Sequence, residues 1–177
     1  MTDENATHPP SPFIARWVAR VAADCAPHQP ALDAAMGRGR HALVMAAAGF
    51  SVIGIDHRLD AVVSANASAR RASLPMNALC ADLTTFPLPR AHFRLIVVSR
   101  YLDRDLFPQL REALAHGAVV LYETFTENQL RYGRGPRSPD HLLRPGELRM
   151  MMRGMEVLFD EEVTEPDALA RIVARRR

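Results

Sequence analysis

The stretch 31–56 constrains the fold more than any other part of the chain. We expect an apolar strand to run into a turn that contains Gly37 and Gly39, with a helix directly after it and a second apolar strand that ends at Asp56. Strand, glycine turn, helix, strand and acid follow one another in this order in a nucleotide-binding βαβ unit. Glycines let the backbone pass close to a ligand, and the helix N-terminus presents unpaired N–H groups to it.

The position of Asp33 separates the two cofactor classes that use this layout. The spacing Gly37-x-Gly39-x-x-Ala42 formally satisfies the dinucleotide pattern. However, Asp33 stands at the end of the first strand, and its carboxylate would repel a pyrophosphate bound at the turn. S-adenosylmethionine carries an ammonium and a sulfonium group, which a carboxylate attracts. The residues therefore favour S-adenosylmethionine over NAD.

The same segment resembles motif I of class I S-adenosylmethionine-dependent methyltransferases, in which an acid precedes a G-x-G-x-G turn. Ala35 stands where the first glycine usually falls, and its methyl group suits the turn if the local φ is negative. The segments 123–125 and 142–148 (Leu-Leu-Arg-Pro-Gly-Glu-Leu) extend the resemblance to a subgroup of small bacterial methyltransferases, which is similar to the tellurite-resistance methyltransferases. The resemblance implies a Rossmann-like α/β fold. Its sheet is mostly parallel and seven-stranded, with a C-terminal antiparallel hairpin and helices on both faces.

Composition indicates an ordinary globular protein. The 177 residues suit one domain over 11–177 after a polar, disordered tail over 1–10, with 48% apolar and 24% charged residues. No apolar run approaches the ~20 residues of a membrane span, and the net charge of +2 is too small to indicate nucleic acid. We expect no membrane or nucleic-acid partner and a cytoplasmic location. The oligomeric state stays open.

Residue types limit the available chemistry. The two cysteines and seven histidines show no metal-ligand spacing, so no metal is expected. All 22 basic residues are arginine, which excludes lysine chemistry, including the Tyr/Lys pair of an NAD-dependent oxidoreductase. A binding module without turnover and an NAD-binding Rossmann protein are the alternatives to a methyltransferase.

Hydrophobic periodicity and turn residues predict the other elements. Ser11 and Pro12 indicate a helix start, and Gly117 indicates a helix end. The predicted helices cover 11–24, 59–71, 106–116 and 145–153, and the predicted strands cover 76–80, 93–98, 118–122, 156–159 and 169–174, with an acidic turn at 160–162 before the last strand.

The candidate cofactor residues lie in the glycine turn and at strand ends. Asp56 can accept both ribose hydroxyl protons. Asp82 matches the position at which the methyltransferases bind the adenine amino group, although it could equally cap a turn. In these enzymes the leading helix covers the pocket, so Trp17 is either part of that cover or a core anchor. The candidate set is Asp33, Ala35, Met36, Gly37, Gly39, Arg40, Asp56, His57, Asp82, Leu83 and Ser99.

Methyl transfer from a sulfonium is an in-line displacement, so positioning matters more than a catalytic triad. Ser99 and Tyr101 follow the fourth strand, where such enzymes often contact substrate. The Asn/Asp-Pro-Pro-aromatic motif of amino-directed nucleic-acid methyltransferases is absent there. Glu123 is a third candidate, either as a base or substrate clamp or as a structural partner of an arginine in the following loop.

The loop 124–144 lacks periodicity and begins at the carboxyl end of a strand, which favours a substrate lid. Its four arginines outnumber its two acids, so an anionic or electron-rich small substrate suits it better than a cation. Alternatively, the loop arginines pair with Glu123, Asp140 or Glu147 and fix the loop in place. The candidate substrate residues are Tyr132, Arg134, Arg137 and Arg144.

Overall fold

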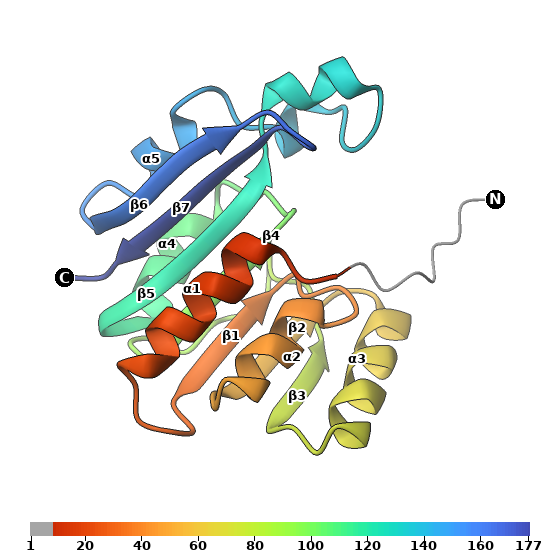
Figure 1. Cartoon of the computed structure of the whole chain (residues 1–177), viewed down its shortest axis with the longest axis vertical. Coiled ribbons are helices and arrows are strands. Elements are labelled where there is room, and N and C mark those ends of the chain that lie inside the picture. The colour runs from red at the N-terminus through yellow and green to blue at the C-terminus, as the bar shows by residue number, and fades with distance from the viewer. Residues whose placement is uncertain (1–8) are drawn as a thin grey trace. The chain divides into compact units, whose positions relative to one another are not determined.

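The computed structural model describes residues 9–177 of the chain. The predicted disordered tail therefore lies outside the described residues, apart from Pro9 and Pro10. Two compact units follow one another along the chain, the first ending at Asp82 and the second beginning at Leu83 (Figure 1). A single domain over 11–177 stays a prediction.

Three parallel strands in the order β3-β2-β1 form the centre of the first unit. In Figure 1, α2 and α3 lie against these strands and α1 lies beside α2. Parallel strands end at the same edge of a sheet, so Asp33 near the end of β1 and Asp56 at the end of β2 lie at one edge. The elements are α1 (Pro12–Ala23), β1 (Pro30–Ala34), α2 (Arg40–Ala47), β2 (Ser51–Asp56), α3 (Leu59–Arg71) and β3 (Met76–Cys80).

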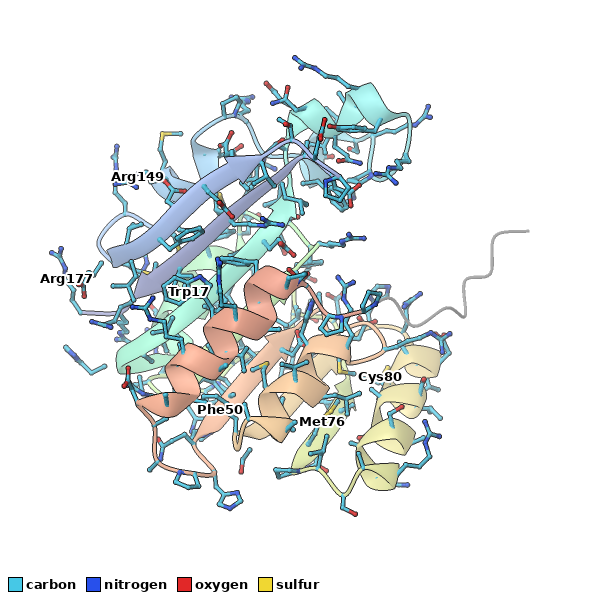
Figure 2. All side chains as sticks on the ribbon, in the orientation of Figure 1. Trp17, Phe50, Met76, Cys80, Arg149 and Arg177 are labelled. Carbon is cyan, nitrogen blue, oxygen red and sulfur yellow. The ribbon has the colours of Figure 1, made fainter. Side chains whose placement is uncertain are left out.

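A glycine lets α2 pack closely on its neighbours. Gly39 is the N-cap residue of α2 and has a φ of +80°. A Cβ on Gly39 would lie 3.0 Å from Cβ of Ala65 in α3 and 3.1 Å from Cε of Met76, which Figure 2 labels at the start of β3. A side chain at this position would therefore push Ala65 or Met76 aside by a few tenths of an ångström, at a backbone conformation that favours glycine.

The start of α1 is tied to the start of α2. Pro12 occupies the first turn, as predicted, but Ser11 makes no side-chain capping bond. Instead its backbone N–H donates to Nε2 of the buried His41 at 3.0 Å. Trp17, labelled on α1 in Figure 2, is 8% exposed and carries the Arg20 guanidinium 5.0 Å from its ring centroid. This burial fits the core-anchor interpretation of Trp17.

The side chain of Asn66 in α3 forms hydrogen bonds with the backbone of β3, which is an edge strand of the part of the chain that the structure describes. The amide nitrogen of Asn66 donates to the Ala78 carbonyl at 3.0 Å, and the Ala78 N–H donates to Oδ1 of Asn66 at 2.8 Å. Unpaired edge groups invite aggregation, so this side chain protects the edge while it fixes α3 on β3.

The strands of the second unit have the order β4-β5-β7-β6, with β4 and β5 parallel and the last two antiparallel. With the three parallel strands of the first unit, this confirms the predicted class, an α/β fold with a mostly parallel set of seven strands and a C-terminal antiparallel pair. The elements are β4 (Phe93–Ser99), α4 (Leu106–Ala113), β5 (Leu114–Phe125), the 3₁₀ helices η1 (Glu127–Tyr132) and η2 (Pro139–His141), α5 (Glu147–Met151), β6 (Glu156–Val163) and β7 (Leu169–Arg175).

The predicted helix over 106–116 is too long, because β5 begins at Leu114. Apolar residues continue at helical spacing through Leu114, but the His92 N–H donates to the Ala113 carbonyl at 2.9 Å, and Leu114 pairs with Phe93 of β4. Gly117, predicted to end the helix, lies within the strand with a φ of +71°. Tertiary pairing therefore overrides the helical pattern at this point.

The terminal elements also differ from the prediction. The acidic residues at 160–162 belong to β6 rather than to a turn, because they continue the antiparallel pairing with β7, in which Glu161 lies opposite Arg171. The Glu161 carboxylate also pairs with the Arg171 guanidinium at 3.1 Å. The predicted helix over 145–153 shortens to α5, which starts after Gly146 in the left-handed region. The loop expected to be irregular contains η1 and η2.

None of the helices within residues 9–177 combines the length and the apolar character needed to cross a membrane.

Replacing Gly39 by alanine should lower the free energy of unfolding by about 2–3 kcal/mol. The new methyl group would crowd Ala65 and Met76 at a positive φ, which costs about 1–2 kcal/mol by itself. Gly49→Ala is the matched control, since Gly49 has a φ of +99° and no heavy atom within 4 Å of the new Cβ. Urea unfolding measures both variants, and equal losses would contradict the packing role of Gly39.

Candidate functional site

The glycine turn is held against the end of β2 by two hydrogen bonds. The Gly37 N–H donates to Oδ2 of Asp56 at 2.8 Å, and the Met36 N–H donates to the Ile55 carbonyl at 3.0 Å. Met36 also packs on Gly54, where a Cβ would overlap the Met36 sulfur. These contacts set the path of the turn independently of any ligand.

Gly37 faces open space. It has a φ of +58°, and a Cβ built on it would meet no heavy atom of the described residues within 4 Å. The turn therefore leaves room for a ligand against its backbone at Gly37, in contrast to Gly39, whose neighbours fill that room.

Ala35 has a left-handed conformation, with a φ of +56°. A negative φ, the condition under which a methyl group would suit the turn, is therefore not met. The turn keeps the backbone shape that a glycine would adopt freely, and the methyl group of Ala35 raises the energy of this conformation by about 1–2 kcal/mol. Strained residues of this kind concentrate at functional sites.

Asp56 has the geometry of a hydroxyl acceptor. Besides the Gly37 N–H, its carboxylate accepts the Arg58 N–H at 2.9 Å, and Nδ1 of the exposed His57 lies 3.9 Å away. Each carboxylate oxygen accepts more than one hydrogen bond, so both oxygens of Asp56 keep capacity for a ligand. Its side chain is 8% exposed, which leaves it accessible from one side.

Asp33 is the most unusual residue of this edge. It is 1% exposed, it accepts a hydrogen bond from the Ala42 N–H, and its Oδ2 atom has no hydrogen-bond partner within residues 9–177. Burial raises the pKa of Asp33 to about 7, the nearby Asp56 charge adds to the rise, and the Arg40 charge opposes it. A cationic ligand group beside Oδ2 would supply the missing partner.

The first unit thus brings together most of the predicted cofactor residues. Asp82 follows β3 and is exposed. The Arg40 guanidinium donates to the Pro9 carbonyl at 3.3 Å. Leu83 and Ser99 belong to the second unit, where Leu83 is buried and Ser99 ends β4. The residues gathered around the glycine turn are Asp33, Ala35, Met36, Gly37, Gly39, Arg40, Asp56 and His57.

In the second unit, Glu123 lies within a cross-strand ion network. Its carboxylate accepts Nε of Arg171 at 2.7 Å, and Arg171 also reaches Glu161 on β6 at 3.1 Å. Glu123 is 2% exposed. Its partner is a β7 residue and not one of the predicted loop arginines. This pairing favours the structural interpretation of Glu123 over that of a base.

Tyr101 contributes its carbonyl to the core. The buried Tyr122 hydroxyl donates to this carbonyl at 2.9 Å, and the Tyr122 ring stacks on Phe107 with 4.9 Å between centroids. Burial raises the pKa of Tyr122, so this hydroxyl stays a donor at every physiological pH.

Two of the predicted substrate residues contact the turn between β6 and β7. The Tyr132 hydroxyl donates to the Thr164 carbonyl, and Arg134 donates to the Pro166 carbonyl at 2.6 Å. Arg134 also pairs with Asp167 at 3.0 Å. The loop is therefore attached to this turn, as in the alternative interpretation, but through partners that the sequence did not indicate.

The other two loop arginines lie elsewhere. Arg137 donates to the Gly133 carbonyl at 3.2 Å within the loop itself. Arg144 lines a cleft of about 420 Å³ that also contains Leu130 and Asp140. At this cleft Arg104, which sequence reasoning missed, donates to both carboxylate oxygens of Glu147 at 2.7 and 3.1 Å.

This Arg104–Glu147 pair explains the position of the segment 142–148. Arg104 also donates to the carbonyls of Asp140 and Leu142, and Glu147 accepts the Arg144 N–H at 2.8 Å. The Arg104 guanidinium holds the pKa of Glu147 below its usual value. Forty-three residues separate the two side chains in sequence, so no local signal could have paired them.

No group of three or more His, Cys, Asp or Glu side chains in the described part of the chain is placed to hold a metal ion.

A family model described as a methyltransferase domain matches residues 31–122. No curated protein matches the chain. Among solved structures, TehB from Haemophilus influenzae superimposes with a TM-score of 0.72 at 18% identity over 92% of this chain, which spans 62% of TehB. An S-adenosylmethionine-dependent methyltransferase from Methanosarcina mazei gives 0.71 at 17% identity over 96% of this chain and 99% of its own.

A third similar structure is geranyl diphosphate C-methyltransferase from Streptomyces coelicolor, solved with Mg²⁺, geranyl diphosphate and S-adenosylhomocysteine. Its TM-score is 0.72 at 16% identity, over 92% of this chain and 79% of the other. At these identities the structural likeness supports the fold.

Replacing Ala35 by glycine should stabilise the protein by about 0.5–1 kcal/mol. Relief of about 1–2 kcal/mol of left-handed strain outweighs the roughly 0.5–1 kcal/mol of extra chain entropy that glycine loses. Ala48→Gly is the control, because Ala48 has a φ of −80° and should only lose stability. Denaturant midpoints report both effects, and a less stable Ala35→Gly variant would contradict the strain.

The buried Asp33 should make the unliganded protein less stable as pH rises. Its pKa is about 7 in the folded chain and about 4 when unfolded, so the folded state binds the extra proton between these values. The free energy of unfolding should fall from about pH 4 to pH 7 and then level off. The free energy of unfolding of the unaltered chain should fall by as much as about 4 kcal/mol over this range, relative to that of Asp33→Asn.

Unfolding of both proteins by urea at pH 4, 6 and 8 measures this difference. Parallel pH profiles for Asp33→Asn and the unaltered chain would show that Asp33 is ionised at no cost in the folded state.

Proposed function

The chain belongs to the family of methyltransferase domains, and from this premise we propose that it transfers a methyl group from S-adenosylmethionine to a small-molecule acceptor. Family membership agrees with the resemblance that motif I predicted. The alternatives weighed from the sequence, a binding module without turnover and an NAD-binding protein, remain as outcomes for experiment.

The buried Asp33 carboxylate, with Oδ2 lacking a partner at the glycine turn, carries this proposal. An isolated buried carboxylate is unfavourable, and the ammonium group of S-adenosylmethionine is the partner that would compensate it. The pyrophosphate of NAD would be repelled. The residues present therefore fit a cationic cofactor.

The remaining contacts of the cofactor follow from the same edge of the first unit. We assign the ribose hydroxyls to Asp56, whose two oxygens keep hydrogen-bonding capacity, and the close approach of the cofactor to Gly37, where no protein atom intervenes. Asp82 is the proposed partner of the adenine amino group. Leu83 and Ser99 stay predictions from the sequence.

When bound, S-adenosylmethionine supplies a methyl group on a sulfonium. The acceptor attacks the methyl carbon in line with the carbon–sulfur bond, and the sulfur leaves as a neutral thioether. The chain's own task is then to orient the two reactants, and good alignment is worth roughly 7 kcal/mol or more. A base is needed only for an acceptor that must first lose a proton. Glu123, ion-paired with Arg171, is assigned to the scaffold, so we propose that no carboxylate base of the second unit is required.

We favour an anionic acceptor. The second unit carries several arginines beyond the carboxyl ends of β4 and β5, the side of a parallel sheet where α/β proteins bind ligands. The similar Streptomyces coelicolor enzyme binds geranyl diphosphate, which supports an anionic small molecule without identifying it. A cytoplasmic location is part of the proposal, since Cys25 and Cys80 are free thiols.

Substitution at Gly37 tests the cofactor assignment. Gly37→Ala should weaken binding of S-adenosylhomocysteine at least tenfold in isothermal titration, because the new methyl group would occupy the space left for the ligand. Gly133→Ala is the matched control, with a φ of +63° and no heavy atom within 4 Å of its Cβ. Both variants should lose about 1–2 kcal/mol of stability, and only the first should lose affinity.

Titration with NAD in place of S-adenosylhomocysteine should show no binding. Tight binding of NAD, or equal affinities of S-adenosylhomocysteine for both variants, would contradict the assignment. A screen of small anions with isotopically labelled S-adenosylmethionine then separates an active enzyme from a binding module.

A further inference from the structure

Two arginines of the second unit share one carboxylate. Nη2 of Arg100 lies 3.0 Å from Oδ2 of Asp167, and Nη2 of Arg134 lies 3.0 Å from Oδ1 of the same residue. Gln129, which is fully buried, adds a longer contact from its amide nitrogen to Oδ1 at 3.4 Å. These side chains come from the end of β4, from the 124–144 loop and from the turn before β7.

The charges of this cluster do not balance. Two guanidinium groups face a single carboxylate, which leaves one excess positive charge. The side chains of Arg100 and Arg134 are 38% and 60% exposed, whereas Asp167 is 16% exposed. Each guanidinium has five N–H donors, and the carboxylate and the Pro166 carbonyl engage only some of them. Because both arginines reach the same carboxylate, one small anion can reach both of them.

The backbone directs Arg100 toward this cluster. Arg100 directly follows β4 and has a φ of +55°, a strained conformation for a residue with a side chain. Its N–H donates to the Glu123 carbonyl at 2.8 Å, and its guanidinium lies 5.4 Å from the ring centroid of Phe125. Phe125 at the end of β5 thus supports the flat guanidinium at the edge where parallel strands end.

We propose that Arg100 and Arg134 bind the anionic group, a phosphate or a carboxylate, of the methyl acceptor, and that Asp167 is an internal counter-ion with which this group competes. The proposal rests on the proposed function and assigns a subsite to its acceptor. Asp167 holds the two guanidinium groups in place before the acceptor arrives and lowers their affinity for any anion that must displace it.

If Asp167 competes with the anion, substituting Asp167 and substituting the arginines should change anion affinity in opposite directions. Removing the charge of Asp167 should then strengthen anion binding. If the ion pair is purely structural, changing either partner should weaken function. The probe is inorganic phosphate, titrated by calorimetry into the whole chain at constant ionic strength. Asp167→Asn should bind phosphate about tenfold more tightly than the unaltered chain, and Arg100→Gln at least tenfold more weakly.

Arg149→Gln is the matched control. Arg149 pairs with Asp160 at 3.0 Å in the same unit, with a side chain as exposed as that of Arg134. Its phosphate affinity should equal that of the unaltered chain. Should Asp167→Asn fail to fold by circular dichroism, Arg134→Gln keeps the Arg100–Asp167 pair and should still lose phosphate binding. Unchanged phosphate affinity in Arg100→Gln and Arg134→Gln, or equal weakening in Arg149→Gln, would overturn the proposal.

S-adenosylhomocysteine titration of the same variants distinguishes a failure of the anion subsite from a failure of the proposed function. Normal S-adenosylhomocysteine affinity without phosphate binding overturns the subsite alone, whereas a chain that does not bind S-adenosylhomocysteine overturns the proposed function. With acceptors found by the labelled screen, Arg100→Gln should raise KM for anionic acceptors and leave kcat nearly unchanged. An acceptor set that is exclusively neutral or cationic would also overturn the subsite.

Discussion

The hydrogen bond between the Gly37 N–H and the Asp56 carboxylate connects the two parts of the candidate cofactor site. It joins the turn after β1 to the end of β2, across 19 residues of sequence, at 2.8 Å. A charge-assisted bond of this kind is among the stronger polar contacts in a protein. Because Asp56 also accepts the Arg58 N–H, one side chain sets both the shape of the turn and the start of the following helix.

The same edge contains two unfavourable features. Asp33 is buried without a full set of partners, and Ala35 has a backbone conformation that favours glycine. A protein selected only for stability would lack both, since each lowers the free energy of unfolding. Strained and incompletely paired residues cluster at functional sites, and a cationic ligand at this turn would compensate the buried carboxylate of Asp33.

The second unit is organised by arginine networks. Arg104 donates to the Glu147 carboxylate and also to two backbone carbonyls. Arg171 pairs with one carboxylate on β5 and one on β6. Guanidinium groups suit these tasks because their donors lie in one rigid plane, which an ammonium lacks. The exclusive use of arginine as the basic residue therefore suits the ion networks of this unit.

The sequence by itself determined the features that depend on near neighbours. The apolar strands, the glycine turn with Asp33 before it, and Asp56 at the end of β2 follow from local patterns, and α3 and β3 match their predicted ranges. Only the tertiary structure decided the positive φ of Ala35, the start of β5 at Leu114 and the pairing of Arg100 with Asp167, which are 67 residues apart. Local preference cannot identify such partners, because cross-strand register and burial select them from many equivalent charges.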